Sequence, residues 1–88
     1  MRIVPGFVVR EVGGKTFAVA TGAIAKKFHG MITLGGSGKE IWDALQEDTT
    51  EEKIVDRLCE VYDVDRKTAT EDVRAFVLRL REAGLLLG

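Results

Sequence analysis

The chain has 88 residues, of which 45% are hydrophobic and 31% are charged, and it contains a single proline. A chain of this length makes one small domain, spanning residues 1–88, with little room for an enclosed catalytic cavity beside a core, which argues against an enzyme. The 13 basic and 14 acidic residues give a formal net charge of -1, so no excess of positive charge is available to neutralise a nucleic-acid backbone.

The first part of the chain, to about Gly36, is rich in glycine and predicts a sheet. Gly13 and Gly14 make the kind of two-residue turn that closes a β-hairpin between two runs of β-branched and aromatic residues. A connection of small residues follows, and glycines then bound a short apolar run. The expected segments are strands at Phe7–Val12 and Thr16–Ala20, a connection at Thr21–Lys27, and a third strand at Met31–Leu34.

The second part of the chain, from Ser37, carries the start signals of helices. Ser37 followed by Glu40 has the spacing of a capping box, in which the two side chains satisfy backbone N–H groups of the first helical turn. Thr49 followed by Glu52 repeats this spacing before a second amphipathic run. In the first helix, one face is expected to hold Ile41, Trp42 and Leu45. In the second, the residues that recur at helical intervals are Ile54, Leu58, Val61 and Tyr62.

A third helix is predicted after a tight turn at Tyr62–Asp65. Asp65 is expected to be its N-cap, and Gly84 is expected to end it, with Leu85–Leu87 packing back on the domain. Apolar residues recur at i, i+4, i+7 and i+11, which places them along one stripe of the helix. The expected buried stripe comprises Ala69, Val73, Phe76 and Leu80.

These elements predict an α+β fold, a three-stranded antiparallel sheet followed by three helices, with the outline of a winged helix-turn-helix. That outline leaves a winged-helix nucleic-acid-binding regulator as the alternative function. A DNA reader would carry mostly Arg, Lys, Asn or Gln on the exposed side of its last helix. Here basic and acidic residues mix along that helix, which argues against such a reader. The residues are Arg74, Arg79 and Arg81 beside Glu71, Asp72 and Glu82.

The residue types that carry redox or metal chemistry are scarce. Cys59 is the one cysteine and His29 the one histidine, which excludes an internal disulfide and argues against a zinc site, so we expect no metal and no organic cofactor. We interpret Cys59 as an inert half-buried thiol, His29 as a turn or surface residue, and Trp42 as part of the core. The single cysteine and the lack of a signal peptide or a long apolar run predict a cytoplasmic protein outside the membrane.

Nearly the whole chain resembles the pyrroloquinoline quinone synthesis protein D (PqqD) family. The resemblance consists in a spacing of apolar anchors, not in a reactive motif. It is carried by Phe28-His29-Gly30-Met31-Ile32-Thr33-Leu34, by Ser37-Gly38 with Ile41-Trp42, by Tyr62-Asp63-Val64, by Asp72-Val73 with Phe76 and Leu80, and by Gly84-Leu85-Leu86.

The resemblance implies a peptide-binding adaptor. Such proteins bind the leader of a ribosomally made precursor peptide and present it to a modifying enzyme, often a radical S-adenosylmethionine (SAM) protein. The third strand has no proline or charge, so the leader is expected to add as a further strand along Met31, Ile32, Thr33 and Leu34. Specificity is expected from a groove between this strand and the last helix, lined by Arg74, Val77, Leu78 and Arg81.

Overall fold

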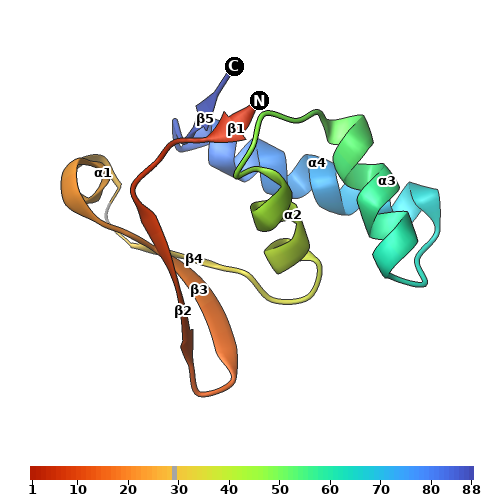
Figure 1. Ribbon diagram of the computed structural model, residues 1–88, viewed down its shortest axis with the longest axis horizontal. Helices are drawn as coiled ribbons and strands as arrows, with labels where there is room; N and C mark the ends of the chain where they lie inside the picture. Colours follow the sequence, from red (N-terminus) through yellow and green to blue (C-terminus); the bar gives the residue numbers. More distant parts are fainter. Residues whose placement is uncertain (29) are drawn as a thin grey trace.

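The computed structural model describes residues 1–28 and 30–88, so the interpretation of His29 lies outside the described residues. The elements follow one another as β1 (Arg2–Ile3), β2 (Phe7–Val12), β3 (Lys15–Ala20), α1 (Gly22–Lys27), β4 (Met31–Thr33), α2 (Gly38–Ala44), α3 (Glu51–Val61), α4 (Arg66–Glu82) and β5 (Leu86–Leu87). Figure 1 shows the sheet to one side of the packed helices α2, α3 and α4. The predicted α+β class is confirmed.

The predicted hairpin is present, and its second strand begins at Lys15, one residue before the expected start. Gly13 and Gly14 have φ values of 59° and 79°, the left-handed conformation that a tight turn between two twisted strands requires. Strand β2 pairs with β3 from Val12 opposite Lys15 to Phe7 opposite Ala20. The three-stranded sheet has the order β2-β3-β4, so β4 is one of its edges.

One helix was not expected from the sequence. The segment interpreted as a connection contains the short helix α1 between β3 and β4. It has six residues, fewer than two turns, and half of them are small, so no apolar helical period is visible in the sequence. The side chain of Ile24 packs against Gly6, where an added Cβ would lie 3.0 Å from Ile24 Cγ1.

The expected capping box at the start of α2 is wrong. Ser37 has helical dihedral angles, φ -72° and ψ -10°, and its side chain makes no capping hydrogen bond. An N-cap residue needs an extended backbone to aim its side chain at the first free N–H groups. Glu40 instead pairs with the guanidinium of Arg57 and ties α2 to α3.

The start of α3 is displaced by one residue from the prediction. The Oγ1 of Thr50, and not that of Thr49, accepts a hydrogen bond from the N–H of Lys53 at 3.2 Å. The N–H of Thr49 donates instead to the carbonyl of Met1 at 2.8 Å. Thr50 has the extended backbone of an N-cap residue, φ -128° and ψ 160°.

Both predicted ends of α4 are confirmed. Asp65 accepts a hydrogen bond from the N–H of Thr68 at 2.7 Å. At the other end Gly84 has a φ of 74°, and the N–H of Leu85 donates to the carbonyl of Leu80 at 2.9 Å. This is the geometry of a Schellman motif, in which a left-handed glycine stops the helix. Beyond it, Leu86–Leu87 pairs with Arg2–Ile3 as the β1-β5 ribbon, which the sequence did not predict.

The carboxylate of Asp65 makes stability depend on pH. Its hydrogen bond from the Thr68 N–H lowers the pKa of Asp65 below the ordinary value, so its contribution is present above the unfolded-state pKa and is lost as pH falls through the folded pKa. We expect Asp65→Ala to lower the unfolding temperature at neutral pH, and the difference from the unmodified chain to shrink in acid. Circular dichroism melts at several pH values measure this. A difference in unfolding temperature that does not change with pH would contradict this expectation. Asp65→Asn is the control, because asparagine can cap the helix but does not titrate.

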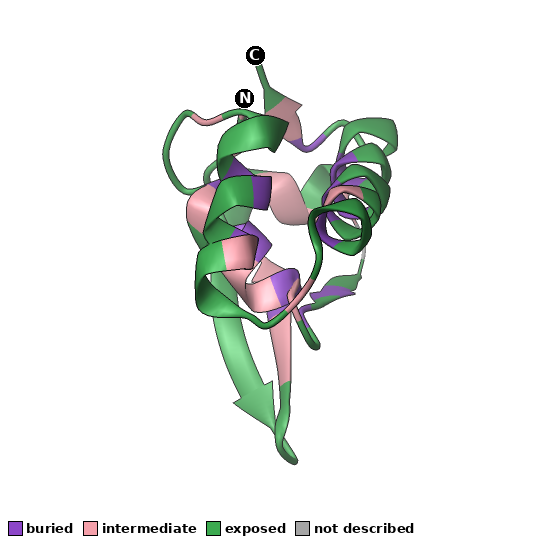
Figure 2. Ribbon diagram, turned by 90° about the vertical axis from the view of Figure 1, so that its right-hand side faces the viewer, coloured by how far each residue is buried: buried purple, intermediate pink, exposed green. Residues whose placement is uncertain are grey.

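The core lies between the sheet and the helices, where Figure 2 shows the buried residues on the inward sides of the elements. The predicted stripe of α4, Ala69, Val73, Phe76 and Leu80, is buried throughout. Trp42 is 2% exposed, and its ring meets that of Phe7 edge-on at a centroid distance of 5.2 Å. Cys59 is half-buried, as expected. No described helix has the length and apolar character needed to span a bilayer.

Candidate functional site

The edge of β4 offers unpaired backbone groups. The N–H of Leu34 donates to the carbonyl of Thr16 at 2.9 Å, and Ile32 lies opposite Ala18 in the same ladder. Alternate residues of an antiparallel strand turn their backbone groups to the same side. Ile32 and Leu34 therefore face β3, while Met31 and Thr33 turn their N–H and C=O groups toward the open side.

The side chains of the predicted third strand divide into two sets. Ile32 and Leu34 are buried in the core, and Met31 and Thr33 are exposed on the outer face. Leu34 lies just beyond the strand, which ends at Thr33. The four residues proposed from the sequence thus have distinct roles: two anchor the strand in the domain, and two leave their backbone free for a partner.

A groove runs between this edge and α4. It has a volume of about 120 Å³, well below the about 300–1,000 Å³ of small-molecule sites. This apolar part of the groove is therefore sized for a single side chain. Its lining is mostly apolar and comprises Phe28, Met31, Ile32, Phe76, Arg79, Leu80, Ala83 and Leu85.

The expected lining of this groove is wrong for the α4 side. Arg74, Val77, Leu78 and Arg81 lie together with Glu51 of α3 around a different hollow. Val77 is only 3% exposed, while Leu78 is 54% exposed. Helical periodicity locates the buried stripe of α4, but the helix has a flank on each side of that stripe. Packing of α4 against α3 decides that the Val77 flank faces α3 and the opposite flank faces β4.

Comparison with known proteins places this chain in a family. A family model described as "Coenzyme PQQ synthesis protein D (PqqD)" matches residues 8–86. The chain belongs to the PqqD family. A solved structure, "TbiB1 in Complex with the TbiA(beta) Leader Peptide", is similar with 30% sequence identity and a TM-score of 0.73, covering 100% of this chain and 96% of that chain. Comparison with the curated proteins yielded no match.

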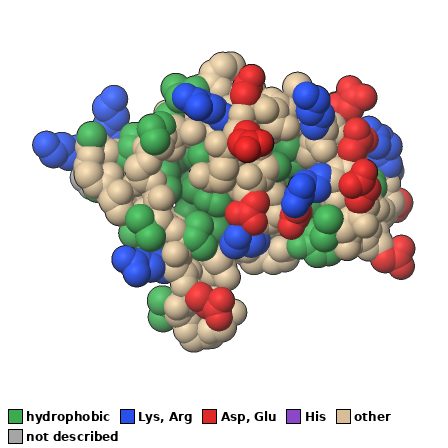
Figure 3. All heavy atoms as spheres, in the orientation of Figure 1, with side chains coloured by type: hydrophobic (Ala, Val, Ile, Leu, Met, Phe, Trp, Pro, Cys, Tyr) green, Lys and Arg blue, Asp and Glu red, His purple; other side chains and the backbone are tan. Residues whose placement is uncertain are grey.

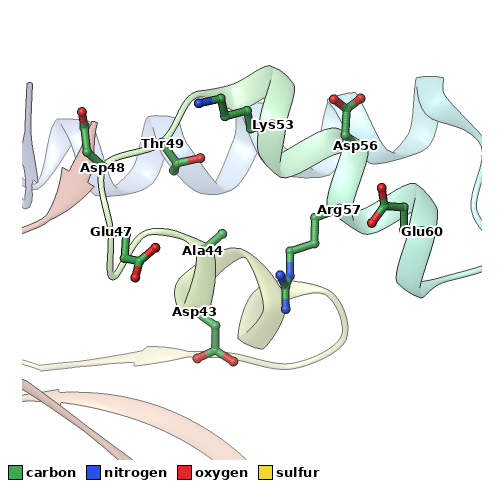
Figure 4. Close-up of a pocket in the computed structure, with 9 residues that line it drawn as sticks. All are labelled: Asp43, Ala44, Glu47, Asp48, Thr49, Lys53, Asp56, Arg57 and Glu60. Atoms are coloured by element: carbon green, nitrogen blue, oxygen red, sulfur yellow. The ribbon is translucent and has the colours of Figure 1, made fainter.

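Another hollow of this PqqD-family chain lies elsewhere, between the end of α2 and α3, with a volume of about 650 Å³. Figure 4 shows Arg57 extending toward α2 while Asp56 points away from it. The carboxylate of Asp56 instead pairs with Arg66 at 2.7 Å. Within residues 1–28 and 30–88, no group of three or more His, Cys, Asp or Glu residues is placed to hold a metal ion. We assign this open, charged hollow no ligand.

Sequence reasoning missed the α4 residues that do face β4. They are Phe76 and Leu80 of the buried stripe, with Arg79 and Ala83 on its flank. Arg79 and Ala83 are four residues apart, which puts them one above the other on a helix. This four-residue spacing is visible in the sequence, but Arg74 and Leu78, on the opposite flank of α4, are also four residues apart. Only the position of the neighbouring elements distinguishes the two flanks.

Proposed function

We propose that this PqqD-family chain binds the leader of a ribosomally made precursor peptide as an additional strand on β4. The observation that carries the proposal is the open edge of Met31 and Thr33 beside an apolar groove. Backbone pairing to an edge strand supplies affinity with little demand on sequence, and neighbouring pockets supply selectivity. The similar structure of TbiB1, which is a complex with the TbiA(beta) leader peptide, supports this proposal.

The groove takes one apolar side chain of the bound peptide. Phe28, Phe76 and Leu80 surround it with apolar surface, and burying one Leu- or Phe-sized side chain contributes about 1.5–3 kcal/mol. Arg74, Val77, Leu78 and Arg81 are not part of this proposal, because they line a hollow on the α3 side.

We further propose that the chain is an adaptor without turnover chemistry. Its partner would be a peptide-modifying enzyme, with a radical SAM protein as the first candidate, and its location the cytoplasm. Family membership supports this role. No observation favours the nucleic-acid alternative: the formal net charge is -1, and Figure 3 shows acidic and basic side chains interspersed over the helices.

Backbone amide chemical-shift mapping tests the proposal. The peptide is the N-terminal part of a short precursor encoded beside this chain. We expect the largest changes at Met31 and Thr33 and along the Phe76–Ala83 side of α4. Changes confined to the Gly13-Gly14 turn, or to the hollow around Leu78, would place the peptide elsewhere and overturn the proposed site.

Filling the groove should block the peptide without unfolding the domain. Ala83 is exposed and lines the groove, so Ala83→Trp is expected to occupy the space of the apolar anchor and to weaken binding at least about tenfold, which is about 1.4 kcal/mol. Isothermal titration calorimetry measures the change. Ala23→Trp, an equal substitution at an exposed position of α1, should bind as the unmodified chain does. Equal affinities for the two variants would contradict the anchor assignment.

A further inference from the structure

The groove beside β4 continues past the apolar pocket. A second hollow, lined by Thr33, Gly35, Gly36 and Asp72 among others, shares Phe76 and Arg79 with the first. The Met31 end of β4 lies by Leu80 and Ala83, and the Thr33 end lies by Asp72 and Ala75. Strand and helix therefore run in opposite directions along one continuous groove, with Phe76 and Arg79 at its middle.

This continuous groove carries two charges of opposite sign. Of the residues that the structure describes, Arg79 and Asp72 are the ionisable ones that line it, and both are exposed. The ion pairs formed within residues 1–28 and 30–88 involve neither of them. A bound peptide thus meets an apolar end, then a cation, then an anion, and neither charge is held in an ion pair with another described residue.

The spacing of the two charges matches an extended peptide. Arg79 follows Asp72 by seven residues, and at about 1.5 Å of rise per residue they are about 10 Å apart along the helix. An extended strand rises about 3.3 Å per residue, so the distance corresponds to about three residues. Side chains of a strand alternate between its two faces, so residues on the same face are an even number of positions apart. The two peptide residues that reach Arg79 and Asp72 are therefore about two or four positions apart.

We propose that this groove selects peptides by charge order: a large apolar residue at the Leu80 end, an acidic residue opposite Arg79, and a basic residue opposite Asp72. The inference rests on the proposed function and adds the class of peptide that the site accepts. Each pair remains partly exposed, so each is expected to change affinity only about 1.5- to 5-fold, and less at high salt. The apolar anchor holds the peptide, and the two charges discriminate between peptides that all carry an anchor.

Selection from a displayed library of random linear peptides on the immobilised full chain tests this proposal. We expect the enriched peptides to share an apolar residue and, at a constant spacing from it, an acidic residue. With Arg79→Glu the acidic position should become Lys or Arg, and with Asp72→Lys the basic position should become acidic, while the apolar position stays the same. Arg79→Gln should abolish the acidic preference without reversing it.

Matched charge reversals on other sides of the same helix are the controls. Arg74 lines the hollow on the α3 side, and Glu71 is exposed and lines neither part of the groove. Arg74→Glu and Glu71→Lys should enrich the same peptides as the unmodified chain. Enriched peptides that share the apolar residue but no charge preference, or whose preference survives Arg79→Glu, overturn the charge order and leave peptide binding intact. A chain that enriches no peptide overturns the proposed function and the charge order with it.

Discussion

Replacing Thr33 with proline is expected to weaken leader binding by at least about tenfold, about 1.4 kcal/mol, while the domain stays folded. Thr33 turns its N–H to the open side of β4, since Leu34 and Ile32 are the residues that face β3. Proline removes only that outward N–H, and edge strands tolerate proline at such positions. The incoming strand loses a backbone hydrogen bond and meets the pyrrolidine ring. Calorimetric titration measures the affinity, and circular dichroism checks the fold.

Two further proline substitutions separate the binding effect from sheet damage. Val9 lies on β2, the other edge of the sheet, and the register places its N–H outward as well. Val9→Pro should therefore leave binding unchanged. Ile32→Pro removes an N–H that faces β3 and should destabilise the sheet itself. Loss of binding with Val9→Pro and not with Thr33→Pro would mean that the leader pairs with β2.

Truncating Trp42 is expected to have the largest effect on stability. Its side chain is 2% exposed and packs edge-on against Phe7 of β2, so it joins α2 to the sheet. Removal of such an aromatic side chain costs about 3–5 kcal/mol, which is a large part of the total of about 5–15 kcal/mol for a folded domain. Trp42→Ala should shift the urea midpoint strongly or prevent cooperative unfolding.

Leu78 supplies the matched control for Trp42. It is a large apolar residue on a helix but is 54% exposed, so Leu78→Ala removes little buried surface. We expect a loss below about 1 kcal/mol, the range of ordinary surface substitutions. Similar losses for the two variants would contradict the assignment of Trp42 to the core and of Leu78 to the surface.

Local chemistry made several elements predictable from the sequence. The two-residue turn at Gly13 and Gly14 needs left-handed dihedral angles that glycine adopts without strain, so the hairpin could be placed from the sequence. Asp65 and Gly84 act within one turn of α4, and their capping roles depend on neighbours in sequence. Each of these interactions joins residues that are close together in the sequence, so the surrounding sequence is sufficient to predict it.

Elements with weak local signals were decided by tertiary contacts. Helix α1 is too short to show a period. The β1-β5 ribbon pairs Ile3 with Leu86, which lie near opposite ends of the chain. The sequence of neither short segment indicates which strand it will pair with. Ser37 and Glu40 have the spacing of a capping box, yet Glu40 pairs with Arg57 of α3. Where a side chain has both a local and a distant partner available, spacing alone does not decide between them.

For the candidate site as well, the sequence determined some features and tertiary packing determined the others. Sequence by itself determined that Met31–Thr33 lie in a short strand without proline or charge, because glycines bound an apolar run there. It also determined that Ala69, Val73, Phe76 and Leu80 form the buried stripe of the last helix, because they recur at helical spacing. Only the tertiary structure decided that β4 is an edge and that Arg79, not Arg74, faces it. Strand order and the rotation of a helix between two neighbours depend on how all elements pack together, and periodicity within one element carries no information about either.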